Sequence, residues 1–110
     1  MREPLVTVFI PVYNREKFIY NSINSILNQT YKNIEVIIID DNSNDNTLNI
    51  IKSFKDDRIK IIENTENKGI PYNRNKGLEL ANGKYLVIMD SDDISHRIRI
   101  EKQVAFLEEN

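Results

Sequence analysis

The alternation of short apolar runs with longer amphipathic segments constrains the fold of this chain more than any other feature. Four runs rich in β-branched residues occupy residues 5–12, 34–40, 59–63 and 85–90. The two most apolar runs show almost no alternation with polar residues, which is typical of strands covered by helices on both faces. These four runs are predicted to be the strands of one sheet.

Segments with helical spacing follow each run. The segment 15–29 places five apolar residues on one helical face, namely Phe18, Ile19, Ile23, Ile26 and Leu27. The segment 41–55 offers Ser43 or Asn44 as an N-cap and spaces Leu48, Ile51 and Phe54 to pack inward.

Two further helices are predicted near the end of the chain. The segment 71–81 begins with Pro71 in its first turn and stops at the helix-ending pair Asn82 and Gly83. The segment 99–110 is predicted to bury three residues, Ile100, Val104 and Leu107. The resulting βαβαβαβα order predicts an α/β fold with a mostly parallel sheet and helices on both faces. No shift in composition marks a boundary, so residues 1–110 are predicted to form a single domain.

Charge and composition exclude several functional classes. The net charge is −2, from 15 basic and 17 acidic residues, and the basic residues are scattered. A nucleic-acid surface needs a concentrated basic face, so no nucleic-acid partner is expected. There is no cysteine, which excludes disulfides and thiolate metal sites. The first apolar run is too short to span a bilayer, so we expect a cytoplasmic protein and leave peripheral membrane association open.

Three polar segments follow predicted strands directly. They are residues 11–14, 40–45 and 90–93. Carboxyl ends of parallel strands share one edge of the sheet, which is where open α/β sheets bind ligands. Although turns also collect Asp and Asn, three such segments together predict a binding site at this edge.

Asp90, Asp92 and Asp93 place three carboxylates within four positions. An acidic turn before a helix is one interpretation, because helix N-termini favour carboxylates. Here the cluster follows an apolar strand, so we expect the carboxylates to be partly buried and to need a cation that relieves their repulsion. A hard divalent ion, Mg²⁺ or Mn²⁺, completed by substrate phosphates and water, meets this need.

Several motifs in a fixed order carry a resemblance to a known family. They are the P-x-Y-N segment at residues 11–14, "QTY" at 29–31, "DDNS" at 40–43, "NKGIPYNRNKG" at 67–77 and the D-x-D at 90–92. In this order and spacing they resemble the nucleotide-binding half of a family 2 glycosyltransferase with the GT-A fold. The resemblance runs from about residue 5 to residue 107.

The resemblance implies roles for residues in the first three segments. Pro11 and Tyr13 would contact the nucleotide, with the Tyr13 ring beside the base, although a half-buried loop tyrosine is the ordinary interpretation of such a residue. Asp41 would accept a hydrogen bond from a pyrimidine ring N–H, which selects uracil or thymine over cytosine. Arg74, at the start of the third helix, would approach the base and phosphates, and Gly69 would let the backbone pass close to the nucleotide.

The resemblance also assigns the acidic cluster. Asp90 would reach the ribose or the metal, and Asp92 would ligate the metal directly, with Asp93 replacing it if the loop register differs. His96 is expected to be a solvated loop residue, since Mg²⁺ prefers oxygen ligands. Family members commonly carry a proline where this chain has Arg97, which leaves the role of Arg99 open.

The activity implied is sugar transfer, with inversion, from a nucleoside diphosphate donor to an acceptor hydroxyl. The donor is expected to be a UDP- or dTDP-sugar, and the acceptor a saccharide, a lipid or a protein. The general base would lie beyond Asn110, in an acceptor-binding half that these residues do not include. We therefore expect a fragment that binds donor and metal without catalysing transfer.

Three alternatives have other functions. A receiver domain has similar length and an acidic Mg²⁺ pocket. Its acidic pair follows the first strand and its lysine follows the fifth strand. In this chain the acidic segments follow the second and fourth predicted strands. A haloacid-dehalogenase-like phosphatase places its D-x-D after the first strand. The third alternative is a module that binds a sugar nucleotide and has no catalytic function.

Overall fold

The structure is a computed structural model, and it describes residues 3–109. Strands and helices alternate through the chain, which confirms the predicted order. The strands are β1 Val6–Val12, β2 Ile34–Asp40, β3 Ile59–Glu63 and β4 Tyr85–Ile88. The helices are α1 Ile19–Leu27, α2 Thr47–Lys52, α3 Ile70–Leu80 and α4 Arg99–Glu109. Within residues 3–109, no helix is both long and apolar enough to cross a bilayer.

The four strands form one parallel sheet in the order β3-β2-β1-β4. β1 pairs with β2 from Val6 opposite Ile34 to Val12 opposite Asp40, and with β4 on its other side. Because all strands run in the same direction, their carboxyl ends meet at a single edge. The α/β fold class is confirmed.

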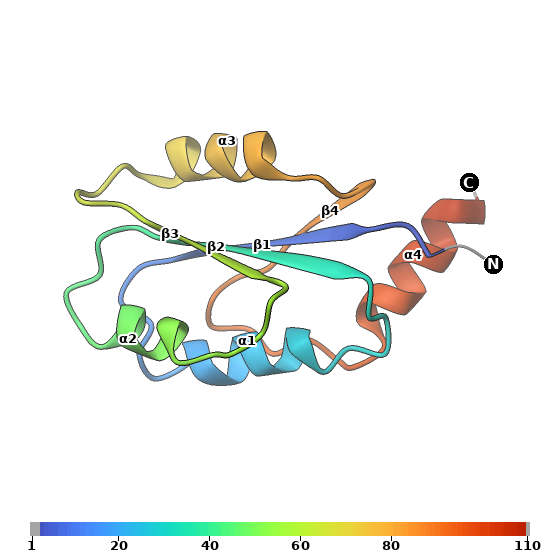
Figure 1. The fold of residues 1–110 in the computed structure, drawn as a ribbon, viewed down its shortest axis with the longest axis horizontal. Helices are drawn as coiled ribbons and strands as arrows, with labels where there is room; N and C mark the ends of the chain where they lie inside the picture. Colours follow the sequence, from blue (N-terminus) through green and yellow to red (C-terminus); the bar gives the residue numbers. More distant parts are fainter. Residues whose placement is uncertain (1–2, 110) are drawn as a thin grey trace.

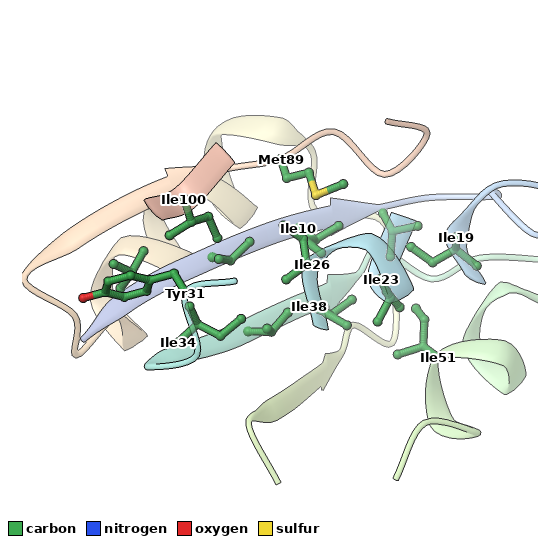
Figure 2. Packing of buried hydrophobic residues seen from close by; sticks show 14 of the residues in the cluster. Ile10, Ile19, Ile23, Ile26, Tyr31, Ile34, Ile38, Ile51, Met89 and Ile100 are labelled. Carbon is green, nitrogen blue, oxygen red and sulfur yellow. The ribbon is translucent and has the colours of Figure 1, made fainter. Parts of the chain in front are cut away.

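Helices cover both faces of the sheet. In Figure 1, α3 lies on one face, and α1 and α2 lie on the other. The larger core fills the space between the sheet and α1, where Ile23 and Ile26 pack against inward-facing residues of β1 and β2 such as Ile10 and Ile38 (Figure 2). Ile100 of α4 joins the same cluster. Spacing of three to four residues puts these helical side chains on one face, as the sequence predicted.

The core under α3 is much smaller. Its buried members are Phe9, Ile37 and Ile39. Gly77 of α3 lies against the Phe9 ring, and a Cβ at this position would come within 2.7 Å of the ring. The absence of a side chain at Gly77 therefore lets α3 approach the sheet closely.

A buried carboxylate anchors the loop between α3 and β4. Glu35 accepts hydrogen bonds from the Thr7 hydroxyl, from the Asn82 backbone N–H at 2.6 Å and from Lys60 Nζ at 3.2 Å. The Gly83 N–H donates to Thr7 Oγ1 at 2.9 Å. Burial raises the pKa of Glu35, but these hydrogen bonds outweigh burial and lower the pKa to about 2.

Some predicted boundaries and contacts are wrong. The helix predicted from residue 15 begins at Ile19, because a hydrogen-bonded turn occupies the preceding residues: Arg15 carbonyl oxygen accepts from the N–H groups of Phe18 and Ile19. Phe18 and Leu107 were predicted to pack inward, but they are 50% and 44% exposed. Phe18 immediately precedes α1, and Leu107 lines an open hollow beside β4 instead of being buried.

The predicted N-caps of the second helix are also wrong. Neither Ser43 nor Asn44 precedes α2 directly, since Asn46 takes that position and makes no side-chain cap hydrogen bond. Ser43 Oγ instead donates to Asp40 Oδ1 at 2.6 Å and accepts from the Asn14 N–H at 2.9 Å. The polar residues after β2 therefore join two loops rather than cap a helix.

Candidate functional site

A hollow of about 520 Å³ opens at the carboxyl edge of the sheet. Its walls come from the segments after β1, β2 and β4 and from the start of α3. The lining residues are Pro11, Val12, Tyr13, Arg15, Asp41, Asn67, Gly69, Ile70, Asn73, Asp90, Ser91 and Asp92. The three polar segments singled out in the sequence thus converge on one place.

Most of the predicted site residues share this hollow, namely Pro11, Tyr13, Asp41, Asp90 and Asp92. Arg74 and Asp93 do not line it. Arg74 is the fifth residue of α3, and its side chain is exposed. It therefore flanks the hollow instead of forming its wall.

Two asparagines with left-handed backbone help to shape the loops after β1 and β2. Asn14 has φ 50° and Asn42 has φ 62°, a region that asparagine tolerates better than most residues. Asn14 Oδ1 accepts from the Asn44 N–H at 2.8 Å, and Asn44 Nδ2 donates to the Tyr13 hydroxyl at 3.4 Å. These contacts hold the half-exposed Tyr13 ring beside the segment that carries Asp41.

Sequence reasoning missed Arg15. It was assigned to the first helix, but the late start of α1 leaves it in the loop, where it lines the hollow. Its N–H donates to Thr47 Oγ1 at 2.8 Å, and its guanidinium donates to the carbonyl oxygens of Tyr13 and Asn14. Its position directly after the P-x-Y-N segment was the available signal. Arg15 supplies a positive charge to a hollow that otherwise carries carboxylates.

Asp41 is buried, at 9% exposure, and is surrounded by hydrogen-bond donors. Its Oδ1 accepts from the Lys68 N–H at 2.7 Å and from Asn64 Nδ2 at 2.9 Å, and its Oδ2 accepts from the Gly69 N–H at 3.2 Å. Burial raises the pKa of Asp41, but the hydrogen bonds outweigh burial and bring the pKa to about 2. Asp41 is therefore a carboxylate at neutral pH.

The segment before α3 approaches Asp41 through its backbone. Gly69 has φ 88°, which allows two successive N–H groups to point at one carboxylate. Asn67 Nδ2 donates to the Asp41 carbonyl oxygen at 2.6 Å. Four more residues line the hollow and were not identified from the sequence: Asn67, Ile70, Asn73 and Ser91. Their residue types are common in ordinary turns and helices, so nothing in the sequence marks them as part of a site.

The acidic cluster forms a compact set of oxygen ligands. Carboxylate oxygens of Asp90, Asp92 and Asp93 lie within 4.8 Å of one another. All three residues are exposed, so the expectation that they are partly buried is wrong: β4 ends at Ile88, and the cluster lies in the loop beyond it. Water can therefore screen their repulsion, and burial does not by itself demand a cation. An all-oxygen donor set of this size still fits Mg²⁺ or Mn²⁺.

The loop that carries this cluster is fixed to α1. Ser22 Oγ donates to the Ser91 carbonyl oxygen at 2.8 Å, and the Ser95 N–H donates to Ser25 Oγ at 3.0 Å. Gln29 Nε2 donates to the His96 carbonyl oxygen at 2.7 Å, which leaves the exposed His96 ring outside the walls of the hollow. Two hydroxyls of α1 and the Gln29 amide just after it thus hold the acidic loop at the edge of the sheet.

Fold and site together define an α/β protein with an acidic ligand site at the carboxyl edge of a parallel sheet. Residues 7–110 match the family described as Glycosyl transferase family 2, and the chain belongs to that family. The family resemblance and the GT-A fold expected from the sequence are confirmed.

Curated relatives cover nearly the whole chain. An uncharacterized glycosyltransferase of Haemophilus influenzae is 43% identical over 100% of the chain and 45% of its own length. The Escherichia coli UDP-Glc:alpha-D-GlcNAc-diphosphoundecaprenol beta-1,3-glucosyltransferase WfaP is 45% identical over 94% of the chain and 41% of its own length. The chain thus spans less than half the length of these relatives.

Solved structures show the same arrangement. Staphylococcus aureus TarS 1-349 in complex with UDP-GlcNAc has a TM-score of 0.88 and 32% identity, over 94% of this chain and 31% of TarS 1-349. The Pyrobaculum calidifontis mannosyltransferase PcManGT, in complex with GDP-Man and Mn²⁺, has a TM-score of 0.77 and 30% identity, over 84% of this chain and 29% of its own.

Proposed function

We propose that this chain is the donor-binding part of an inverting glycosyltransferase that uses a UDP- or dTDP-sugar. The observation that carries the proposal is the placement of Asp41 and two members of the acidic cluster, Asp90 and Asp92, in the walls of one hollow. Relatives named for transfer from UDP-Glc and a similar structure that holds UDP-GlcNAc support it. The receiver and phosphatase alternatives lose support with the family assignment.

Each end of the hollow suits a different part of the donor. At the Asp41 end, a base N–H would donate to an ionised carboxylate, and the Tyr13 ring offers stacking area beside it. Arg15 is the cation that lines the hollow and would pair with the diphosphate. Arg74, expected in that role, is exposed near the start of α3 and would approach the diphosphate from beside the hollow.

The acidic loop is proposed to hold a divalent metal. Asp92 and Asp90 line the hollow and would face the diphosphate, while Asp93 lies in the same cluster outside the walls. Bound Mg²⁺ or Mn²⁺ would offset the negative charge that develops on the departing diphosphate. The serine contacts with α1 keep these carboxylates in place before a ligand arrives.

We also propose several features of the whole protein. The acceptor is a saccharide, lipid or protein hydroxyl, and the general base lies beyond Asn110. The chain alone would bind donor but not transfer sugar. We place the protein in the cytoplasm, with association at the inner face of the membrane.

Calorimetric titration of UDP into the purified protein, with and without Mn²⁺, tests this function. We expect metal-dependent binding that weakens in Asp92→Asn, and at least a tenfold loss of UDP preference over CDP in Asp41→Ala, since a hydrogen bond to a charged group contributes about 1.5–3 kcal/mol. Asp57→Asn, an exposed carboxylate beside the amino end of β3, is the matched control. GDP is titrated in parallel because it also offers a ring N–H. Absence of UDP binding both with and without Mn²⁺ would refute the proposal.

A further inference from the structure

We propose that Asn64 and Asn73 are positioning residues that hold Asp41 so that a single carboxylate oxygen reads the nucleotide base. This inference rests on the proposed function, because it assigns a role within the base end of the same hollow. Asn64 lies outside the motifs that carried the family resemblance, and Asn73 lies in one of them but was given no role there. The two act as a pair, since the Asn64 amide contacts both Asn73 and Asp41.

The bridging amide is that of Asn64. Its Nδ2 donates to Asp41 Oδ1 at 2.9 Å and to Asn73 Oδ1 at 2.8 Å. Asn64 follows β3, Asp41 follows β2 and Asn73 lies in the first turn of α3, so the pair joins three segments. Asn73 is 3% exposed, and its N–H donates to the Gly69 carbonyl oxygen at 3.2 Å. Because the Asn73 side chain is buried and its Oδ1 accepts from Asn64, its amide cannot easily rotate away.

The hydrogen bonds divide unequally between the two carboxylate oxygens. Oδ1 accepts two donors, Asn64 Nδ2 and the Lys68 N–H, whereas the Gly69 N–H is the single described donor to Oδ2 and lies at the longer distance of 3.2 Å. Each carboxylate oxygen can accept about two hydrogen bonds. Oδ2 therefore has capacity left for a base N–H, and the contacts at Oδ1 determine where Oδ2 points.

The hydrogen-bond donors around Asp41 are neutral, so the carboxylate keeps its negative charge for a base N–H. The described donors to the Asp41 carboxylate are two backbone N–H groups and an amide, and none of them cancels its charge. Hydrogen bonding by the Asn64 and Asn73 side chains contributes to the lowered pKa of Asp41. The segments around Asp41 also carry the charged groups of Asp40, Lys68, Arg74, Arg15, Asp90 and Asp92. The Lys68 ammonium is engaged by Glu66 at 2.9 Å.

Loss of these amides should change which base is read. Without them, only the Lys68 and Gly69 N–H groups would offset burial, so the pKa of Asp41 would rise. A protonated carboxyl donates instead of accepting, which favours N3 of cytosine, an acceptor, over the N3–H of uracil. The ratio of UDP to CDP affinity should then fall as the pH falls, at pH values where the wild-type ratio stays constant.

The experiment measures UDP and CDP dissociation constants for Asn64→Leu and Asn73→Leu from pH 8 down to about pH 6, above the range in which cytosine N3 itself takes up a proton. We expect the UDP preference at pH 7 to fall by about tenfold, equivalent to the loss of one charge-assisted contact, and to fall further at the lower end of this range. Asn64→Asp, nearly equal in shape, keeps the packing but places a second carboxylate beside Asp41, and it should shift the profile further. If the leucine variants do not fold, the base preference of Asn64→Asp tests whether Asn64 positions Asp41.

Asn82→Leu is the matched control, because Asn82 Nδ2 also donates to a buried carboxylate, Glu35, at 3.3 Å but at the opposite edge of the sheet. It should lower the melting temperature without changing base preference. The inference would be overturned if folded Asn64 and Asn73 variants kept the wild-type ratio of UDP to CDP affinity and its pH dependence. It would also be overturned if Asn82→Leu changed this ratio equally. Wild-type UDP binding that Asp41→Ala impairs would still support the proposed function. A wild-type protein that binds no UDP would overturn both.

Discussion

The contact between Gly77 and Phe9 shows how one missing side chain sets the position of a helix. A methyl group at residue 77 would lie 2.7 Å from a ring that is 1% exposed. Interiors packed this tightly have no free volume to absorb an added carbon. The separation between α3 and the sheet therefore depends on this glycine.

Gly77→Ala should destabilise the protein, although alanine is the better helix former. Overpacking costs about 1–3 kcal/mol, whereas the gain in helix propensity is about 1 kcal/mol. Urea denaturation measures the difference. Asn75→Ala, at an exposed position of the same helix, is the control and should be neutral or stabilising. Equal or greater stability of Gly77→Ala would show that Phe9 can move aside.

At the same scale, sequence motifs identified site residues whose chemistry is unusual and missed those whose chemistry is common. Asp41 and the D-x-D could be predicted because carboxylates directly after apolar strands are conspicuous. Arg15 could not, since its role depends on where α1 begins, and the residues before Ile19 have a helical pattern but form a separate turn. Asn73 resembles any polar residue of a surface helix, yet its side chain is buried.

Among the elements, β2 carries acidic residues at both ends, and those at one end have a different role from the one at the other. Glu35, near the amino end, binds the loop between α3 and β4, while Asp40 ends the strand and Asp41 enters the candidate site. The bounds of β2 and β3 match the prediction, because continuous β-branched runs end abruptly at polar residues. Helix starts could not be located as well, since amphipathic spacing continues into the preceding turns.

Glu35 should make the fold sensitive to acid. Its pKa in the folded protein is about 2, below the ordinary value of 4.5, so its contribution to stability is complete above pH 4.5 and is lost as the pH falls towards 2. The shift corresponds to about 3 kcal/mol as an upper estimate. Chemical denaturation between pH 7 and 2.5 should show this loss in the wild type and a smaller pH dependence in Glu35→Gln. Glu66→Gln, an exposed carboxylate, is the control. Identical pH dependence in all three proteins would contradict the assignment.

For the whole molecule, the two faces of the sheet differ in the core beneath them. The face towards α1 contains the large cluster of Figure 2, whereas the face towards α3 contains three buried apolar residues. The buried residues of α3 itself are Asn73 and Gly77. The helix that contributes Asn73 to the candidate site therefore has the weaker apolar attachment.

Amide hydrogen exchange should reveal this asymmetry. We expect α3 to exchange through a partial opening while α1, β1 and β2 exchange only with global unfolding, because local stability follows the apolar contacts that an opening breaks. Mass spectrometry of exchange at several denaturant concentrations separates the two regimes. Equal opening free energies for α1 and α3 would show that the polar contacts at the ends of α3 compensate for its small core.

The strand order has a consequence for the time course of folding. β1 is first along the chain but lies inside the sheet, and its two partners are β2, the next strand, and β4, which follows only after β3 and α3. Contacts between residues far apart in sequence carry a larger loop-closure entropy and form more slowly. β1, β2 and β3 can thus assemble while the ribosome is still supplying β4. The acidic loop follows β4, so Asp90, Asp92 and Asp93 should reach their positions only after the hydrogen bonds around Asp41 have formed.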